Sequence, residues 1–373
     1  MKLLIKLTPL EPYFLGDDRS FQYGELKIQR AAGYISHSRI TPSQTTLFGV
    51  LRYLGIKTPD PDFKLDCQDI ENIGKSSFNL PKPNADGFGR IISVSPLYLY
   101  DNNGQYYVRT PFDHNNKGNY TSYEPWEKYT EFIPTGCGQR IFPEDYDEKS
   151  GLEDSWTCLK DLSLHSKLFK RVMQVGHEKK GVSEAFYKKE RVVIHKDFSF
   201  AFIAEVKDGF YKEPAETDPK SPEKRVVYLG QDKSTFLAEI ITDFTEPSFC
   251  LLRNQIKTNT VYALSDIYIQ PEVKITKGET VNSNNENEKD KMRKLYSLCN
   301  FVCAQSIDFR VFRTDYSLKL PHGKRFIKEP ELIRLIAAGS VFIVNDLNRF
   351  KELCHNEHAE KAGFNQLLEG SRK

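Results

Sequence analysis

The amino-acid sequence predicts an α+β protein built from two related halves. Strand-like and helix-like stretches lie beside each other near both ends of the chain, and the composition includes 25 Phe and 19 Tyr. Aromatic side chains fit pleated, half-buried surfaces, so this composition favours sheet. The chain, at 373 residues, is long for one domain. We therefore expect a first domain over residues 1–195 and a second over 196–373, with the boundary somewhere between about 190 and 225.

The first 56 residues predict a strand, a loop and a helix, in that order. KLLIKLTPL alternates as a strand does, and EPYFLGDDRSFQYGE is rich in turn formers. Four apolar residues then recur at the i, i+3, i+4, i+7 spacing of one helix face: Leu47, Val50, Leu51 and Leu54. Ser43 or Thr41 can cap the start of this helix, and Gly55 can end it. This order is typical of a βαβ or ferredoxin-like unit.

Most of the remaining periodic stretches predict strands. They are residues 90–100 and 105–111 around a turn at 101–104, then 198–206, 225–230, 235–241, 247–253, 260–265, 309–313 and 338–344. A helix is predicted over 345–358. The most polar stretch, 277–291, is predicted to be a mobile loop.

Positive charge is concentrated in three segments, although the formal net charge is only +2. Lys and Arg outnumber Asp and Glu by 8 to 4 in residues 1–57, by 10 to 4 in 160–196, and by 9 to 4 in 293–334. If these segments converge in space, they form a groove that suits a polyanion. The alternative is that each is ordinary solvated surface.

The sequence lacks the usual catalytic and metal-binding motifs. No phosphate-binding loop, dinucleotide-binding glycine motif, nucleophile elbow or H-E-x-x-H is present. Cys354, His355 and His358 form an incomplete ligand set, so we expect no metal and no cofactor. Cys299 and Cys303 lie in an apolar segment and are expected in the core. We do not expect an enzyme.

The cysteine pattern and the hydropathy point to the cytoplasm. The seven cysteines are scattered without a C-x-x-C pair, as in proteins with reduced thiols. No apolar run approaches the roughly 20 residues of a membrane helix. The first residues predict a strand rather than a signal peptide. No membrane association is expected.

The stretch ISHSRITPSQTTLFGVLRYLGI, residues 35–56, places small hydroxyls and Arg39 where a helix begins. One interpretation is that Thr41 and Ser43 only cap the helix. The other is that the helix N-terminus, with its unpaired N–H groups, grips the phosphates of a nucleic acid without reading bases. The residues alone leave both open.

Several stretches resemble those of a known family. TPLEPYFLGDDRSF and TPSQTTLFGVLRYLGI are similar to the N-terminal signature of CRISPR-associated RAMP proteins, in particular the Cmr-type subunit of type III-B effector complexes. The matching residues are Pro12, Phe14, Arg19, Phe21, Pro42, Ser43, Gly49, Leu51 and Arg52. Residues 175–206, 226–236, 337–344 and 362–370 also resemble family segments. A glycine-rich element expected near Arg310 to Arg325 is not evident.

The resemblance implies two ferredoxin-like (RAMP/RRM-like) domains with large loop insertions. It also implies a non-catalytic role in antiviral defence: holding the repeat-derived 5′ tag of crRNA. The implied partners are the crRNA, the large polymerase-like subunit and the backbone RAMP subunit, with target RNA contacted indirectly.

The residues expected to contact RNA are Arg19, Ser38, Arg39, Thr41, Ser43, Gln44, Thr45, Arg52, Lys179, Lys180, Arg310, Arg313, Lys324 and Arg325. Tag bases are expected to stack on aromatic rings such as Phe14 or Phe21. Two alternatives stay open. One is a metal-independent endoribonuclease of the same fold that processes crRNA. In it, His37 or a Tyr/Lys pair would activate a 2′-hydroxyl for attack on the phosphate. The other is a protein-only scaffold.

Overall fold

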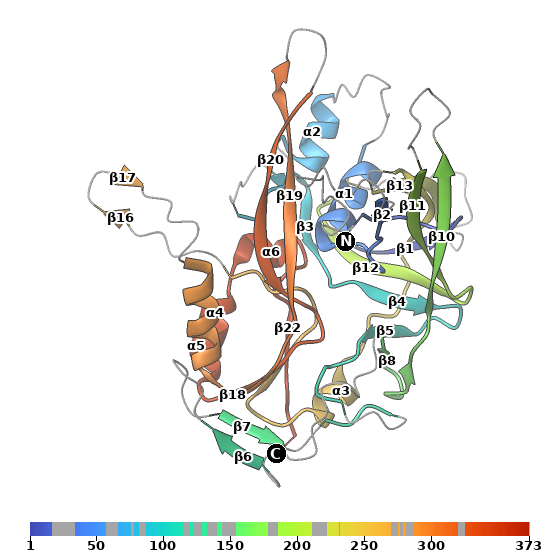
Figure 1. Ribbon diagram of the computed structural model, residues 1–373. Helices are drawn as coiled ribbons and strands as arrows, with labels where there is room; N and C mark the ends of the chain where they lie inside the picture. The colour runs from blue at the N-terminus through green and yellow to red at the C-terminus, as the bar shows by residue number, and fades with distance from the viewer. Residues whose placement is uncertain are drawn as a thin grey trace.

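The protein combines antiparallel sheets with a few short helices, as the predicted α+β class requires (Figure 1). The computed structural model describes residues 1–16, 34–56, 66–75, 78–81, 87–114, 119–122, 129–132, 140–143, 154–177, 186–210, 222–230, 232–269, 275–276, 279–280, 287–319 and 325–372. In these residues no helix is long and apolar enough to span a membrane.

A nine-stranded antiparallel sheet forms the main body. Its order is β13 (Glu223–Leu229), β14 (Ser234–Ile241), β1 (Lys2–Pro9), β12 (Phe198–Val206), β4 (Tyr98–Asp101), β5 (Tyr106–Arg109), β8 (Trp156–Cys158) and β9 (Leu164–His165), and β3 (Ile91–Val94) also pairs with β12. The predicted strands at 198–206 and around the 101–104 turn are confirmed. The division at residue 195 stays a prediction, and strands from both sides of it share this sheet.

Helix α1 (Gln44–Leu54) packs on one face of this sheet, close to α2 (Cys67–Ile73). Its four predicted core residues are buried in the same cluster as Leu3, Ile5 and Leu7 of β1. Ser43 is the N-cap, as predicted, because its side-chain oxygen accepts the N–H of Thr46. The predicted helix and its buried face are therefore confirmed.

A smaller sheet carries the C-terminal part of the chain. Its order is β18 (Cys299–Cys303), β21 (Val341–Val344), β15 (Thr260–Ala263) and β22 (Leu367–Glu369). Helices α4 (Asn287–Ser297) and α5 (Leu347–Cys354) contribute side chains to its core, and α6 (Glu357–Lys361) follows. Cys299 and Cys303 are buried, as predicted.

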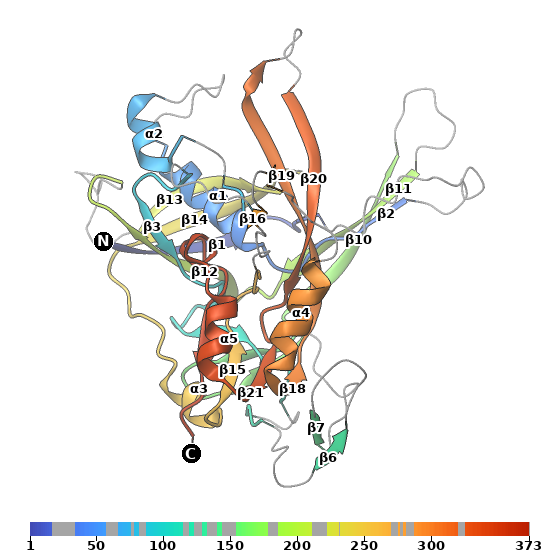
Figure 2. The same ribbon diagram turned by 90° about the vertical axis from the view of Figure 1, so that its left-hand side faces the viewer.

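Two long hairpins project from the body (Figures 1 and 2). One joins β10 (Phe169–His177) to β11 (Phe186–Ile194), with β2 (Tyr34–Ser36) paired parallel to β11. The other joins β19 (Ser306–Lys319) to β20 (Arg325–Ile336). Smaller pairs are β6 (Tyr129–Phe132) with β7 (Arg140–Pro143), and β16 (Ile275–Thr276) with β17 (Glu279–Thr280). Figure 2 shows the two long hairpins diverging from a common base.

Two predicted elements are wrong. Residues 247–253 are not a strand but lead into α3 (Cys250–Gln255), in which Leu252 is buried. A short apolar run fits a buried strand and a short helix equally well, so the spacing of its apolar residues could not distinguish the two. The predicted loop at 277–291 runs into α4, because Glu and Lys have good helix propensity even in a strongly polar stretch.

Candidate nucleic-acid interface

A cavity of about 960 Å³ lies at the base of the two long hairpins, beside the start of α1. Its walls come from residues 37–44, the end of β5, β8, β10, the segment after β15, and the bases of β19 and β20. These segments are far apart in the sequence. The fold therefore assembles the cavity from both the N-terminal and C-terminal parts of the chain.

The loop over residues 37–43 is held from both ends. The parallel pairing of β2 with β11 fixes its entry, and α1 fixes its exit. Between them, the Ser38 hydroxyl accepts the N–H of Leu15 at 2.9 Å and donates to the carbonyl of Arg39 at 2.8 Å. The Tyr13 hydroxyl donates to the carbonyl of Ile40 at 2.5 Å. Ser38, which was expected to contact RNA, is buried and uses its hydroxyl to shape this loop.

Small hydroxyls cluster at the first turn of α1. The Ser43 oxygen lies 2.9 Å from the hydroxyls of Thr45 and Thr46, and it accepts the Thr46 N–H at 3.3 Å. Thr41 and Ser43 line the cavity beside them. Ser43 therefore caps the helix, whereas the interpretation that Thr41 and Ser43 serve only as caps stays a prediction. The phosphate-binding interpretation stays a prediction.

Gln44 and Trp156 are cavity-lining residues with an unpaired buried atom. Gln44 is 4% exposed, and its amide nitrogen donates to the carbonyls of Gly363 at 2.9 Å and Ser95 at 3.3 Å. Its oxygen Oε1 has no hydrogen-bond partner among the described residues. The indole nitrogen of Trp156, a residue 3% exposed, likewise has none within the described part of the chain. Trp156 was not anticipated from the sequence.

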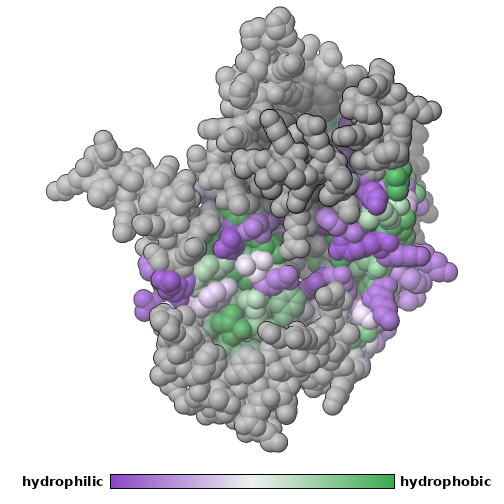
Figure 3. Space-filling model, in the orientation of Figure 1, coloured by the Kyte–Doolittle hydropathy of each residue, from purple (hydrophilic) through white to green (hydrophobic). Residues whose placement is uncertain are grey.

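Four arginines line the cavity. Arg39, Arg171 and Arg334 come one each from the three basic segments of the sequence. Arg109, at the end of β5, lies outside those segments and was not anticipated. One arginine from each of the three basic segments thus meets the others at this cavity. Figure 3 shows hydrophilic side chains gathered over the β10–β11 hairpin, on the right of the view.

Three of these arginines, Arg109, Arg171 and Arg334, are each held by an ion pair. Arg109 pairs with Asp154 at 3.1 Å, and Arg171 pairs with Glu190. Arg334 meets the Asp308 carboxylate at 3.2 Å. A guanidinium carries five N–H donors, so one pairing leaves others for a phosphate.

Two further titratable groups face the same cavity. Asp266 accepts the N–H of Ala338 at 2.9 Å. Burial raises the pKa of its carboxyl, while that hydrogen bond and the charges of Arg39 and Arg109 act in the opposite direction. His37 lies at the rim, where its Nδ1 is 3.4 Å from a carboxylate oxygen of Glu190.

One residue expected to contact RNA, Arg52, lies away from this cavity. Arg52 lies at the other end of α1, with its guanidinium 3.5 Å from the carbonyl of Gly74 and 6.0 Å from the ring centre of Phe48. The backbones of Arg310, Arg313 and Arg325 belong to the β19–β20 hairpin. Outside the described residues lie Arg19, Phe21, Lys179, Lys180 and Lys324.

The expectation that Phe14 offers an open ring to a base is wrong. Phe14 is 7% exposed, and the ammonium of Lys189 lies 4.7 Å from its ring centre. The ring is therefore taken up by a cation–π contact within the protein.

The histidines and cysteine near residue 355 have separate partners. His355 Nδ1 lies 2.8 Å from Glu360, and His358 Nε2 lies 3.1 Å from the carbonyl of Asn79. Cys354 is buried, which raises the pKa of its thiol to about 12. Within the described ranges, no three His, Cys, Asp or Glu side chains group as metal ligands do. The absence of a metal stays a prediction.

The fold and the cavity define an α+β protein with an arginine-lined site that suits a polyanion. No family model matches the chain, and no curated protein does. Among solved structures, a chain of the cryo-EM structure of the Type III-B Cmr-beta bound to cognate target RNA is similar, with 14% identity and a TM-score of 0.47. A chain from the same assembly with target RNA and AMPPnP, state 1, has 14% identity and a TM-score of 0.48. Each comparison covers 98% of this chain and 96% of the other.

Proposed function

We propose that this protein is a non-catalytic crRNA-binding subunit of a type III CRISPR effector complex. It holds the repeat-derived 5′ tag and serves antiviral defence. The observation that carries the proposal is the convergence of Arg39, Arg171 and Arg334 in one cavity. The resemblance of residues 8–21 and 41–56 to RAMP proteins supports the identity of the RNA.

The geometry favours single-stranded RNA. Guanidinium donors left over from the ion pairs bind phosphate oxygens, while the hydroxyls of Thr41 and Ser43 add short, adaptable hydrogen bonds. The cavity is wide enough for an unstacked nucleotide, and sequence-specific RNA recognition generally targets unstacked, single-stranded bases. Both long hairpins contribute residues from their bases to the cavity wall and project away from it (Figure 1).

The partners follow from the same resemblance. They are the large polymerase-like subunit and the backbone RAMP subunit, with target RNA met only through the guide. We also propose that the chain consists of two ferredoxin-like domains with insertions and works in the cytoplasm.

The endoribonuclease alternative requires His37 as a base or a Tyr/Lys pair. The His37 ring lies beside Glu190 at the rim of the cavity, and Glu190 also pairs with Arg171. That contact orients the imidazole, as it would for a general base and for a positioning residue alike. A base must lie within hydrogen-bond distance of the 2′-hydroxyl whose proton it removes, and the RNA-cleavage assay below tests this role.

The experiment is fluorescence anisotropy with 5′-labelled single-stranded RNA, either repeat-derived or scrambled, in rising salt. Wild-type protein is expected to bind the repeat-derived RNA in a salt-dependent manner and leave it intact. The triple variant Arg39→Ala, Arg171→Ala, Arg334→Ala is expected to bind at least about tenfold more weakly, because charged hydrogen bonds contribute roughly 1.5–3 kcal/mol each. Arg349→Ala, an exposed arginine of α5, is the matched control.

Two outcomes contradict the proposal. A defined cleavage product that disappears in His37→Ala assigns the endoribonuclease role. Absence of salt-sensitive RNA binding by the folded chain favours the protein-only scaffold.

A further inference from the structure

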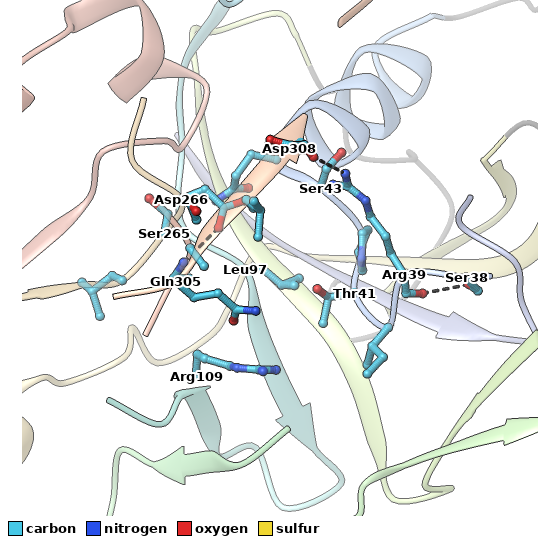
Figure 4. Close-up of a pocket in the computed structure, with 18 of the residues that line it drawn as sticks. Ser38, Arg39, Thr41, Ser43, Leu97, Arg109, Ser265, Asp266, Gln305 and Asp308 are labelled. Atoms are coloured by element: carbon cyan, nitrogen blue, oxygen red, sulfur yellow. Dashed lines mark hydrogen bonds between the residues drawn. The ribbon is translucent and has the colours of Figure 1, made fainter. Parts of the chain in front are cut away.

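The polar groups of the cavity are divided between its walls (Figure 4). Arg39, Thr41 and Ser43 lie on one side, at the start of α1. Asp266 lies on the opposite side. The guanidinium of Arg109 extends into the space below them. One wall therefore suits phosphate, while the other presents a carboxylate, a group that accepts hydrogen bonds.

Two residues of the cavity lining each carry a buried polar atom without a hydrogen-bond partner among the described residues. These atoms are Gln44 Oε1 and Trp156 Nε1. A buried polar atom without a partner is destabilising, so native proteins rarely keep one unless a ligand, an ion or a water satisfies it.

Asp266 supplies the chemical selectivity. The bond from the Ala338 N–H occupies one position on Oδ1, and an ionised carboxylate has about four acceptor positions. Guanine presents two parallel donors, N1–H and the 2-amino group, which match the two oxygens of a carboxylate. Adenine and cytosine present one amino group. Uracil presents a single N–H between two carbonyl oxygens, which a carboxylate repels.

Apolar side chains complete the cavity. Leu97 lies between the two polar walls, and Phe112 and Trp156 belong to the lining as well. The lining is mainly polar, and the cavity volume of about 960 Å³ accommodates a nucleotide. A paired base could not present its Watson–Crick edge to Asp266.

We propose that this cavity binds one unstacked nucleotide and reads the edge of its base through Asp266, with guanine preferred and uracil disfavoured. This inference rests on the proposed RNA-binding function and adds to it: the site reads a base in addition to gripping the backbone. Arg39 and Arg109 both line the cavity, on different sides of it, and supply positive charge to the nucleotide.

The test is calorimetric titration of the full chain with the four nucleoside 5′-monophosphates. GMP is expected to bind at least about tenfold more tightly than UMP, because a good bidentate pair discriminates bases by that order. AMP and CMP should fall between them. In Asp266→Asn the amide oxygen still accepts the Ala338 N–H, but one acceptor oxygen becomes a donor. That variant should lose the GMP preference and bind UMP more tightly than wild type, because the amide removes the repulsion and can pair with the uracil N–H and a neighbouring carbonyl oxygen.

The matched control is Asp346→Asn, which preserves the acceptor that caps α5 and lies outside the cavity. It should retain the GMP preference. Equal affinities of wild type for all four nucleotides, or an Asp266→Asn variant that still prefers GMP, overturns base reading. If that happens while the triple arginine variant still loses RNA binding, the proposed function stands without it. If the arginine variant binds RNA normally, the proposed function itself fails.

Discussion

The guanidinium of Arg39 donates to the main-chain carbonyl of Asp308 at 3.1 Å, across a sequence separation of 269 residues. The same guanidinium lies 5.7 Å from the ring centre of Phe309. These contacts tie the loop before α1 to the base of the β19–β20 hairpin. The arginine that the sequence marks as a phosphate ligand is therefore also a structural link between the two ends of the chain.

Removing two cavity arginines should weaken RNA binding at every salt concentration. The change is Arg39→Ala with Arg171→Ala. The log–log slope of affinity against salt should become shallower by roughly 0.7 for each lost single-strand phosphate contact. Anisotropy titrations between low and moderate salt measure it. An unchanged slope in the folded double variant would show that these side chains serve only their ion pairs, and Arg349→Ala provides the reference.

Ser43→Ala should cost about 1 kcal/mol of the free energy of unfolding, because the N–H of Thr46 loses its capping acceptor. Ser43→Asp should retain the cap and the stability, since a carboxylate is favourable at a helix N-terminus. The same carboxylate would repel phosphate. Chemical denaturation and RNA titration together separate the two roles: Ser43→Asp with normal stability and normal RNA affinity would leave Ser43 as a cap alone.

Gly363→Ala should destabilise the protein by about 2 kcal/mol or more. Gly363 has φ +89, and a Cβ there would lie 2.7 Å from the carbonyl oxygen of Ser95 and 3.1 Å from the amide nitrogen of Gln44. The matched control is Gly49→Ala on the exposed side of α1, where a Cβ meets nothing within 4 Å. That control should stabilise by roughly 0.5–1 kcal/mol. If Gly49→Ala lowered the thermal unfolding temperature more than Gly363→Ala, the close packing around Gly363 would be contradicted.

Asp113→Asn should stabilise the protein more at pH 8 than at pH 5. Burial raises the pKa of Asp113 from 3.8 to about 7, although the Tyr120 hydroxyl that donates to it at 3.0 Å opposes the shift. Between these pKa values the folded state binds a proton that the unfolded state has lost. The free energy of unfolding therefore falls as pH rises from about 4 to 7, and the loss remains at higher pH.

Asparagine keeps the acceptor for Tyr120 and carries no charge. The gain at pH 8 should reach roughly 2–4 kcal/mol, because one pKa unit corresponds to about 1.4 kcal/mol. Urea denaturation at both pH values measures it. An equal effect at pH 5 and pH 8 would mean that Asp113 titrates normally in the folded protein.

Local chemistry decided which features could be predicted from the sequence. The cap at Ser43 and the buried face of α1 follow from spacing within one helix, so both were predicted. The meeting of the basic segments could be stated only as one of two alternatives. Counting charges along the sequence does not show which segments lie close together in space. Arg109 and Trp156 were missed because their place in the cavity depends on strand pairing between distant segments. Arg52 was expected to contact RNA because it is close in sequence to the start of α1. It lies in the last turn of this 11-residue helix, at the end away from the cavity.

The bond from Gln44 to Gly363 spans 319 positions, which has a consequence for biosynthesis. At roughly 5–20 residues per second, a ribosome needs about 15–60 s to make the chain between these two residues. During that interval α1 can form, but the wall that carries Asp266, Gln305 and Arg334 does not yet exist beside it. The nascent chain thus emerges with its N-terminal arginines and no finished cavity, and the cavity wall is complete only after the segment up to Gly363 has been made.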